Sequence, residues 1–468
     1  MKINVLTFLI IASLTLDSCT KNPDQASPDP NQQQPSNEFV YYNYYSVYNA
    51  LTTIDSVDFV RVCYDLKNDK VVWQKKNKKV IPRGYWNGST GYGMDYSKSF
   101  QTDDAVIRFY MTTSKVNQSD QTPGIDGVYF QKVDKKTGEE TLINLIPANE
   151  LPVNTHFTIS QVETDGTNYF FHAVNGFVYC VRPDGSIKWK KGGYTPGNNV
   201  GYAEQQWSFV YLYDGKVFSV RYDASIDHRI LFGLNTETGE KEFEDLAAYY
   251  SPTTKQFLFA KNHFLETSGG STPVTVLTTY HATHYLGIHN NFAAPIAAWN
   301  DSTFLYAYSG GAVRYMTVAN PNRISSIPGY FASNMNFIYQ DKKLYGATAT
   351  HNTQPSTDSF FVNCMDPNPA NGHILWTKTY PLTNSLNKVL YNYFLKNNRL
   401  YLFTNFYIDN NKIVDNEVVG GKYTATAIVI NPQTGDIIKQ HKGIPLSRSG
   451  VSINYDTYIG GMFNITID

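Results

Sequence analysis

The amino-acid sequence predicts an all-β fold that is built from repeated antiparallel hairpins. Aromatic residues make up 15% of the 468 residues, with 36 Tyr and 27 Phe, and charged residues make up only 17%. Aromatic side chains favour strands over helices. In the stretch "NYFFHAVNGFVYCVRPDGSIKWKK", Asn175-Gly176 and Asp184-Gly185 separate three apolar runs. Both dipeptides suit turns that need positive φ, so the stretch predicts a three-stranded antiparallel meander.

Similar hairpins recur along the chain. Turn signals separate apolar runs near residues 214, 262, 310, 341 and 397. The first three of these signals are spaced by 48 residues, and a hairpin at a fixed interval indicates a repeat architecture. We therefore expect one structural unit that the chain uses many times.

A second pattern lies further along each unit. The segments "DKKTG" (134–138), "NTETG" (235–239) and "NPQTG" (431–435) share an Asp or Asn, two variable residues, Thr and Gly. The Asx side chain can accept N–H bonds across the turn, and the glycine can take the left-handed conformation that closes it.

A large apolar residue follows most of these turns at a fixed distance. It stands four residues after Gly138, Gly185, Gly239, Gly372 and the related Asp69, as Leu142, Trp189, Phe243, Trp376 and Trp73. An even offset in a strand keeps such residues on one face, so each is expected to pack on a neighbouring unit. Lys439 breaks the rule after Gly435.

This combination of turn and tryptophan strand resembles the repeat of the PQQ-like (quinoprotein-dehydrogenase-like) β-propellers. The resemblance covers most of residues 57–445 and includes the non-catalytic outer-membrane lipoprotein type. It implies four-stranded antiparallel blades. Turn signals near 68, 136, 184, 237, 370 and 433, and weaker ones near 282 and 320, favour eight blades, with seven as the alternative. Residues 451–468 are expected to return to the first blade and close the ring, so that the propeller domain comprises residues 39–468.

The N-terminus predicts a secreted and lipid-anchored protein. Residues 1–18 have Lys2 followed by an apolar run that is too short to span a bilayer, which is typical of a signal peptide. The sequence Leu16-Asp17-Ser18-Cys19 resembles a bacterial lipobox, which makes Cys19 the predicted lipid attachment residue; an ordinary signal peptide is the alternative. Thr20 points, by resemblance to Gram-negative lipoproteins, to the outer membrane. Residues 20–38 are rich in Pro, Gln and Asn and predict a flexible tether.

The remaining candidate residues are predicted to have structural rather than catalytic or ligand-binding roles. Cys63 and Cys364 stand two residues before Asp65 and Asp366, as Gly233 stands before Asn235, and Cys180 has the same place before Arg182. All three cysteines are therefore predicted to be small core residues of separate blades, without disulfides. A redox thiol, a stacking role for Trp73, Trp189 and Trp376, and a metal site at His281, His284 and His289 are the alternatives. No catalytic, cofactor-binding or metal-ligating residue is predicted. The quinoprotein enzymes that share the resembling repeat have an adjacent Cys-Cys pair and a haem-attachment motif, and both are missing from this sequence.

The predicted function is binding. A formal net charge of -1 gives no reason to expect nucleic acid as a partner. We expect a lipid-anchored, non-catalytic propeller that binds a protein partner or serves as a scaffold at the outer membrane. A glycan-binding module of a nutrient-capture system is the first alternative, and a quinone- or metal-dependent enzyme is the second. The Tyr-rich segments at 38–51 and 84–97 suit recognition loops, and the former suits a strand on the propeller flank equally well.

Overall fold

We analysed a computed structural model of the chain. By their internal contacts, the residues divide into two compact units, Met1–Glu38 and Phe39–Asp468, and every strand belongs to the second. The structure describes residues 38–48, 56–79, 99–116, 123–151, 162–173, 175–192, 210–223, 228–246, 254–260, 263–268, 274–279, 285–290, 293–308, 312–328, 336–350, 359–381, 391–409, 412–414, 417–419, 422–448 and 463–468.

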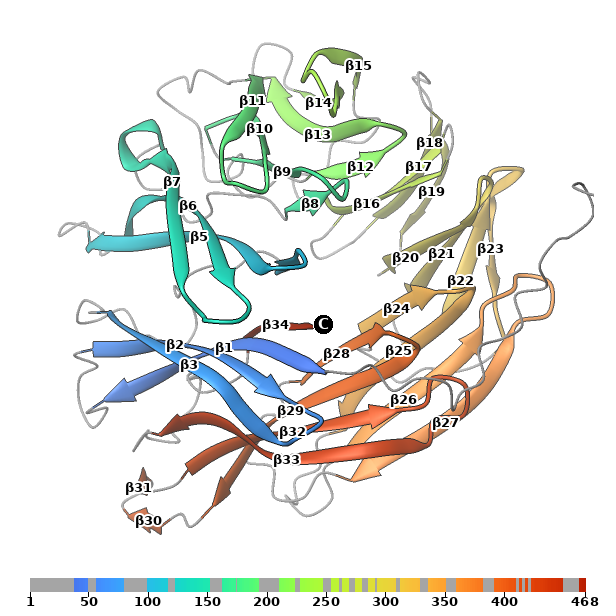
Figure 1. Ribbon diagram of the computed structural model, residues 1–468. Coiled ribbons are helices and arrows are strands. Elements are labelled where there is room, and N and C mark those ends of the chain that lie inside the picture. Colours follow the sequence, from blue (N-terminus) through green and yellow to red (C-terminus); the bar gives the residue numbers. More distant parts are fainter. Residues whose placement is uncertain are drawn as a thin grey trace, which may run out of the picture. The chain divides into compact units, whose positions relative to one another are not determined.

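The described strands form eight four-stranded antiparallel sheets, which are the blades of a β-propeller. The prediction of an all-β propeller with eight blades is therefore confirmed. Blades are numbered here in chain order, and the four strands of each are called first to fourth from the inside outward. Figure 1 shows the blades as successive fans of arrows.

Blades 1 to 4 contain the following strands, given from first to fourth. Blade 1 has β34 (Phe463–Ile467), β1 (Phe39–Tyr48), β2 (Ser56–Asp65) and β3 (Lys70–Lys79). Blade 2 has β4 (Phe100–Gln101), β5 (Ala105–Val116), β6 (Pro123–Asp134) and β7 (Glu140–Pro147). Blade 3 has β8 (Glu163–Thr164), β9 (Tyr169–His172), β10 (Phe177–Val181) and β11 (Ile187–Gly192). Blade 4 has β12 (Tyr211–Tyr213), β13 (Lys216–Asp223), β14 (His228–Asn235) and β15 (Lys241–Leu246).

Blades 5 to 8 repeat this order. Blade 5 has β16 (Thr254–Ala260), β17 (His263–Ser268), β18 (Val274–Thr279) and β19 (Tyr285–Asn290). Blade 6 has β20 (Ala293–Asn300), β21 (Thr303–Tyr308), β22 (Val313–Thr317) and β23 (Asn320–Ser326). Blade 7 has β24 (Asn336–Gln340), β25 (Lys343–Thr350), β26 (Ser359–Asp366) and β27 (His373–Pro381). Blade 8 has β28 (Tyr391–Lys396), β29 (Arg399–Asp409), β32 (Lys422–Ile430) and β33 (Ile437–Arg448).

Two short elements lie outside this scheme. The hairpin of β30 (Lys412–Val414) and β31 (Glu417–Val419) is inserted between the second and third strands of blade 8. One turn of 3-10 helix, η1 (Ala148–Glu150), follows β7. Among the described residues it is the only helical element.

The chain ends close the ring by sharing blade 1. Strand β34 from the C-terminal end pairs antiparallel with β1 from the other end of the domain, as Figure 1 shows in red and blue. This confirms the expected closure for residues 463–467. A closed ring removes the exposed sheet edges through which an open repeat array would aggregate.

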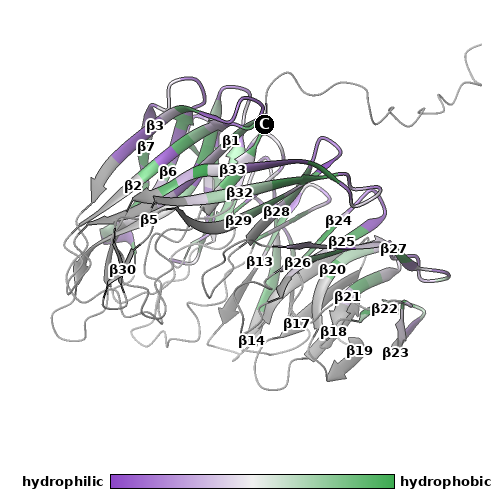
Figure 2. Ribbon diagram, turned by 90° about the horizontal axis from the view of Figure 1, so that it is seen from below, coloured by the Kyte–Doolittle hydropathy of each residue, from purple (hydrophilic) through white to green (hydrophobic). Residues whose placement is uncertain are grey.

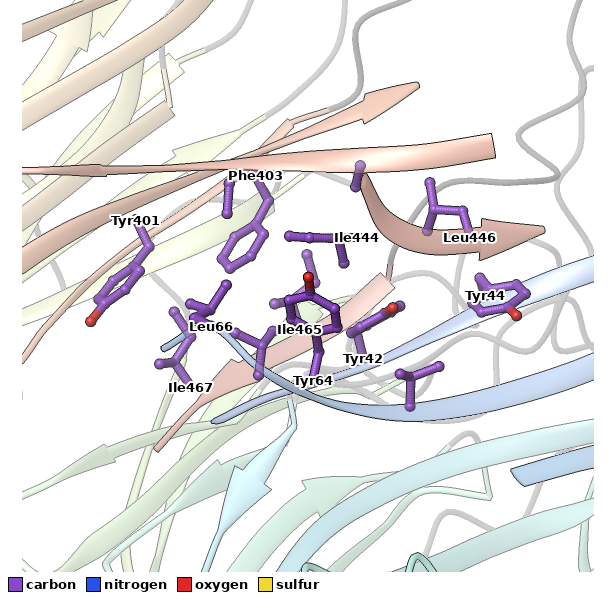
Figure 3. Close-up of a cluster of buried hydrophobic side chains, with 14 of the residues drawn as sticks. Tyr42, Tyr44, Tyr64, Leu66, Tyr401, Phe403, Ile444, Leu446, Ile465 and Ile467 are labelled. Atoms are coloured by element: carbon purple, nitrogen blue, oxygen red, sulfur yellow. The ribbon is translucent and has the colours of Figure 1, made fainter. Parts of the chain in front are cut away.

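A large apolar cluster stabilises the closure. It joins β34, β1 and β2 of blade 1 to β29, β32 and β33 of blade 8, and Figure 3 shows many of its side chains. The Tyr42 hydroxyl also donates to the carbonyl of Pro445 across the two blades, at 2.6 Å. The tyrosines of segment 38–51 whose side chains are described, Tyr41, Tyr42 and Tyr44, are buried, so the interpretation of this segment as a strand is correct.

Each middle strand faces two neighbouring blades. In β10, Tyr179 and Val181 belong to a cluster shared with blade 2, whereas Val178 and Cys180 belong to a cluster shared with blade 4. Because successive side chains of a strand point to opposite faces, a strand between two blades has to be apolar on both. This explains why "FVYCV" is a continuous apolar run rather than an alternating one.

Candidate functional site

The turns at one end of the blades form a surface that we call the turn face. It comprises the inner turns, between first and second strands, and the outer turns, between third and fourth strands. The described outer turns lie where the sequence predicted them, near 68, 136, 184, 237, 320, 370 and 433, and the predicted turn near 282 lies outside the described residues. In Figure 2 the turns beside β3 and β7 have the purple of hydrophilic residues.

The outer turns are held by their own side chains. Asp134 Oδ1 accepts from the backbone N–H groups of Lys136 and Thr137, at 2.9 and 2.7 Å. These bonds stabilise the charged carboxylate and lower the pKa of Asp134. Asn235 Oδ1 accepts in the same way from Glu237 and Thr238, and Gly239 closes the turn at a φ of 71°. The predicted Asx-turn is thus confirmed.

A tryptophan fixes several outer turns to the preceding blade. The indole N–H groups of Trp73, Trp189 and Trp376 donate to the carbonyl one residue after the turn's Asx residue, at 2.8, 3.0 and 3.0 Å. The glycine of each turn lies against the ring, where an added Cβ would approach within 2.8 Å. We call this arrangement the tryptophan joint. It confirms that these tryptophans are blade-packing residues.

Lys439 has the position of the tryptophan at the joint between blades 8 and 1. Its ammonium group donates to the carbonyl of Leu66 at 3.1 Å, and Leu66 follows Asp65 as the indole acceptors follow their Asx residues. It also lies 3.8 Å from the carboxylate of Asp69. The residue that breaks the sequence rule therefore preserves the hydrogen bond of the joint while losing its apolar contact.

Leu142 does not pack on a neighbour, contrary to the prediction. In blades 1, 3, 4, 7 and 8 a β-bulge lies directly beside the residue four positions after the turn. In blade 2 the register shift comes later, between Val128 and Tyr129, so Leu142 faces the other way and is 45% exposed. Ile143 contacts Gly185 of blade 3 instead. A shift of one residue turns a side chain to the opposite face.

The three cysteines have the predicted place in their blades. Cys63, Cys180 and Cys364 are buried and unbridged, and each is the strand partner of a joint tryptophan. Each also has an aromatic residue on its other side, so that two aromatic rings meet over a small side chain. For Cys180 these rings are Phe170 and Trp189, whose centroids are 5.9 Å apart. The position needs a small residue, which explains why Gly233 can occupy it in blade 4.

Burial should make these thiols unreactive. It raises the pKa of Cys63 and Cys180 to about 12 and that of Cys364 to about 11, so almost no thiolate is present at neutral pH. We expect all three to react slowly with a thiol reagent in the native protein and rapidly after denaturation. Cys180→Ala should cost only about 1 kcal/mol. Rapid native labelling of Cys180 with loss of binding would contradict the architectural role.

A polar cluster lies where blades 8, 1 and 2 meet on the turn face. Asp468 accepts a hydrogen bond from the Tyr41 hydroxyl at 3.0 Å and pairs with Lys135 of blade 2. Lys396 donates to the Ile467 carbonyl and, at 3.1 Å, to Gln101. Partial burial lowers the pKa of Lys396. These contacts fix the end of β34 to both neighbouring blades, so the cluster serves closure of the ring.

Polar side chains are also buried between blades, which the sequence did not indicate. Between blades 1 and 2, Arg61 pairs with Glu140, and Arg108 donates to the Asn43 side chain at 3.0 Å. Between blades 3 and 4, the ring of His172 lies 2.7 Å from the Ser219 hydroxyl, and burial lowers its pKa to about 4. The imidazole is therefore neutral at pH 7. These groups have partners across the joints, which is what burial of a polar side chain requires.

The inner turns carry most of the exposed charge at the centre of the turn face. Tight turns at Asp214-Gly215 and Asp341-Lys342 have positive φ at both central residues, as type I′ hairpins require. Described inner turns of blades 2, 3, 4, 6 and 7 expose Asp103, Asp104, Asp165, Asp214, Asp301 and Asp341. Lys342 is the one exposed lysine or arginine of these turns in the described residues, and on the adjoining strands Lys132 lies 3.1 Å from Asp104 and Lys216 lies 3.9 Å from Asp214. The inner turns therefore present a negative surface.

Several sequence-predicted residues lie outside the described part of the chain. These include the signal peptide, Cys19, residues 20–37 of the tether, His281, His284 and segment 84–97. His289 lies in β19, opposite Thr275. In the described part, no three His, Cys, Asp or Glu side chains are placed to hold a metal ion. The same ranges contain no helix with the length and apolar character to cross a membrane.

Comparisons with known proteins give structural likenesses of low sequence identity. No protein-family model and no curated protein sequence matches this chain. A computationally designed protein, Ika8, is similar with a TM-score of 0.45 and 10% identity over 75% of this chain and 89% of its own. BamB from Moraxella catarrhalis is similar with a TM-score of 0.40 and 12% identity over 64% and 80% of the two chains. The C-terminal WD40 domain of Sif2 is similar with a TM-score of 0.42 and 9% identity over 78% of this chain and 87% of its own.

Proposed function

We propose that this chain is a lipid-anchored, non-catalytic propeller of the PQQ-like type that binds a protein partner at the outer membrane. The observation that supports binding best is the turn face. Its turns are short and hydrogen-bonded by their own side chains, and at the tryptophan joints the outer turns are fixed to the preceding blade. Exposed side chains on such turns lose little conformational freedom on binding, which favours affinity.

The charge of the inner turns suggests the chemistry of the partner. Six exposed aspartates surround the centre of this face, and only Lys342 offers an exposed positive charge among the described inner turns. A negative surface attracts a basic surface, increases its rate of association and makes that rate sensitive to salt. We therefore propose a basic or amide-rich segment of a protein as the ligand of the turn face.

Neutralising the inner turns should weaken partner binding. The triple variant Asp165→Asn, Asp214→Asn and Asp341→Asn removes three charges, and the amide introduced at position 165 keeps an oxygen that can accept the turn N–H bonds of Thr167 and Asn168. Affinity isolation from solubilised membranes should recover a partner with wild-type protein, lose most of it with the triple variant, and lose it at high salt. The matched control neutralises Glu242 and Glu244 on the outermost strand of blade 4 and Glu240 directly before it. Equal recovery by both variants would contradict the proposal, and binding only to a glycan array would favour the glycan alternative.

The anchor has a separate test. Cys19→Ala removes the thiol that would carry the lipid, so the variant should no longer incorporate a labelled fatty acid. Wild-type protein should incorporate the label and partition into the detergent phase, and the matched variant Cys180→Ala should behave like wild type. A wild-type protein that is unlabelled would contradict the anchor.

A further inference from the structure

Exposed aliphatic side chains gather at one structural position of the propeller. All seven large hydrophobic residues that are exposed among the described ones lie on outermost strands, close after an outer turn. Five of them belong to the consecutive blades 7, 8 and 1, and we call these five the aliphatic rim: Leu375, Ile437, Ile438, Val71 and Val72.

The bulge of the outermost strand places three of these residues equivalently. In the strand pairings Val72, Leu375 and Ile438 are each the residue skipped by the register, directly before the joint position. At the same skipped position, blades 3 and 4 have Lys188 and Glu242. A bulge leaves its extra residue unpaired, and here Val72, Leu375 and Ile438 are 44%, 42% and 47% exposed. Three neighbouring blades therefore present an aliphatic side chain where two others present a charge.

The charges around the rim differ between the two sides of the ring. On the turns and outermost strands of blades 8 and 1, the exposed charged residues are Lys67, Lys70, Lys76, Lys439 and Lys442, with Asp69 and Asp436. On blade 4, which is four blades from blade 8 and three from blade 1, they are Glu237, Glu240, Glu242 and Glu244, with Lys241. Lys188 and Lys191 of blade 3 pair with Glu237 and Glu240. The aliphatic rim thus lies in basic surroundings, which suits the anionic headgroups of a lipid surface.

The tether joins the propeller beside this rim. Phe39, the first residue of β1, pairs with Asp65, where the outer turn of blade 1 begins. The chain therefore enters blade 1 at the turn end, and β1 is two strand spacings, about 10 Å, from β3 and its exposed valines. The flexible tether that the sequence predicts for residues 20–38 would have a reach of roughly 25 Å. It would hold this end of blade 1 near the bilayer.

We propose that the aliphatic rim of blades 7, 8 and 1 is a membrane-contacting surface, on which the propeller lies against the lipid headgroups beside its own anchor. Apolar side chains flanked by lysines are the combination that binds at a bilayer interface. In this orientation the acidic blade 4 points away from the lipid. The inference rests on the anchor proposed at Cys19.

Site-specific labels can test the orientation in the full, lipidated protein. Val72→Cys and Ile438→Cys introduce exposed thiols on the rim. The controls are Glu242→Cys, at the equivalent position of blade 4, and Ile187→Cys, on the outermost strand of blade 3, where Ile187 is 40% exposed. The three native thiols are buried, so a spin label should react selectively with the new one. The protein is then incorporated into vesicles of phosphatidylethanolamine and phosphatidylglycerol.

The rim labels should be several-fold more accessible to oxygen dissolved in the bilayer than the control labels, and several-fold less accessible to a water-soluble relaxation agent. Equal accessibility at all four positions, in protein that floats with the vesicles, would overturn the membrane contact but leave the anchor intact. Wild-type protein that does not float would overturn the anchor and this orientation together. Rim labels that are shielded in native membranes but not in lipid vesicles would show that a protein covers the rim, which also overturns the proposal.

Discussion

Replacing Trp189 with alanine is expected to lower the free energy of unfolding by about 3–5 kcal/mol, the usual cost of truncating a buried tryptophan. The ring is 8% exposed and lies between Phe170 of its own blade and Gly239 of blade 4. Its removal leaves a cavity at the joint. It also leaves the carbonyl of Thr236 without the indole donor that lies 3.0 Å away.

Denaturant unfolding followed by circular dichroism measures this effect. Leu142→Ala is the matched control, because Leu142 has the same offset from its turn glycine but is 45% exposed. That variant should change stability by no more than about 0.5 kcal/mol. If Trp189→Ala had an effect as small as the control, the joint would contribute little and the stability of the ring would come from other contacts.

The local features of the fold were predictable from the sequence because turn chemistry is local. Asp134, Asn235 and Asn431 accept N–H bonds from residues two or three positions ahead, and the glycines of these turns need a conformation that few other residues adopt. The same residue types therefore recur at these turn positions in several blades. The small residue before the turn was also predictable, since Cys63, Cys364 and Gly233 all lie beneath an aromatic pair.

The equal spacing of the hairpins near 214, 262 and 310 wrongly suggested that all three join equivalent strands of their blades. The hairpins at 214 and 262 join first and second strands, but the one at 310 joins the second and third strands of blade 6. The corresponding turn of blade 6 contains Asp301 and Ser302, so the second interval of 48 residues connects different positions. Blade lengths vary because the connections between strands vary, and a hairpin pattern does not say which pair of strands it joins.

The contacts between blades were not predictable, because they depend on register and on residues far apart in the chain. Nothing near Lys439 in the sequence indicates that it replaces an indole N–H at Leu66, 373 positions away. The place of a bulge decided whether Leu142 or Ile143 became the packing residue. The aliphatic rim is visible in the sequence only as two aliphatic pairs directly after an outer turn, Val71-Val72 and Ile437-Ile438. Only the structure, with its bulges, shows that these side chains are exposed.

Gly239→Ala and Gly215→Ala should separate backbone strain from packing at the joint. Both glycines have left-handed backbones, with φ of 71° and 69°. Alanine costs about 1–2 kcal/mol in that conformation. A Cβ on Gly215 would meet nothing within 4 Å, so its variant should lose only this amount.

A Cβ on Gly239 would lie 2.8 Å from the ring of Trp189, so Gly239→Ala should lose about 1–3 kcal/mol more than Gly215→Ala through overpacking. Most of the excess should vanish when both variants are made in a Trp189→Ala background, because the ring is then absent and the other close atom, Lys191 Cγ at 2.8 Å, belongs to a flexible side chain. A double-mutant cycle in denaturant measures this coupling between residues on different blades. If the excess persisted without the ring, Gly239 would be required by the turn alone, and the turn glycine would have no part in joining the blades.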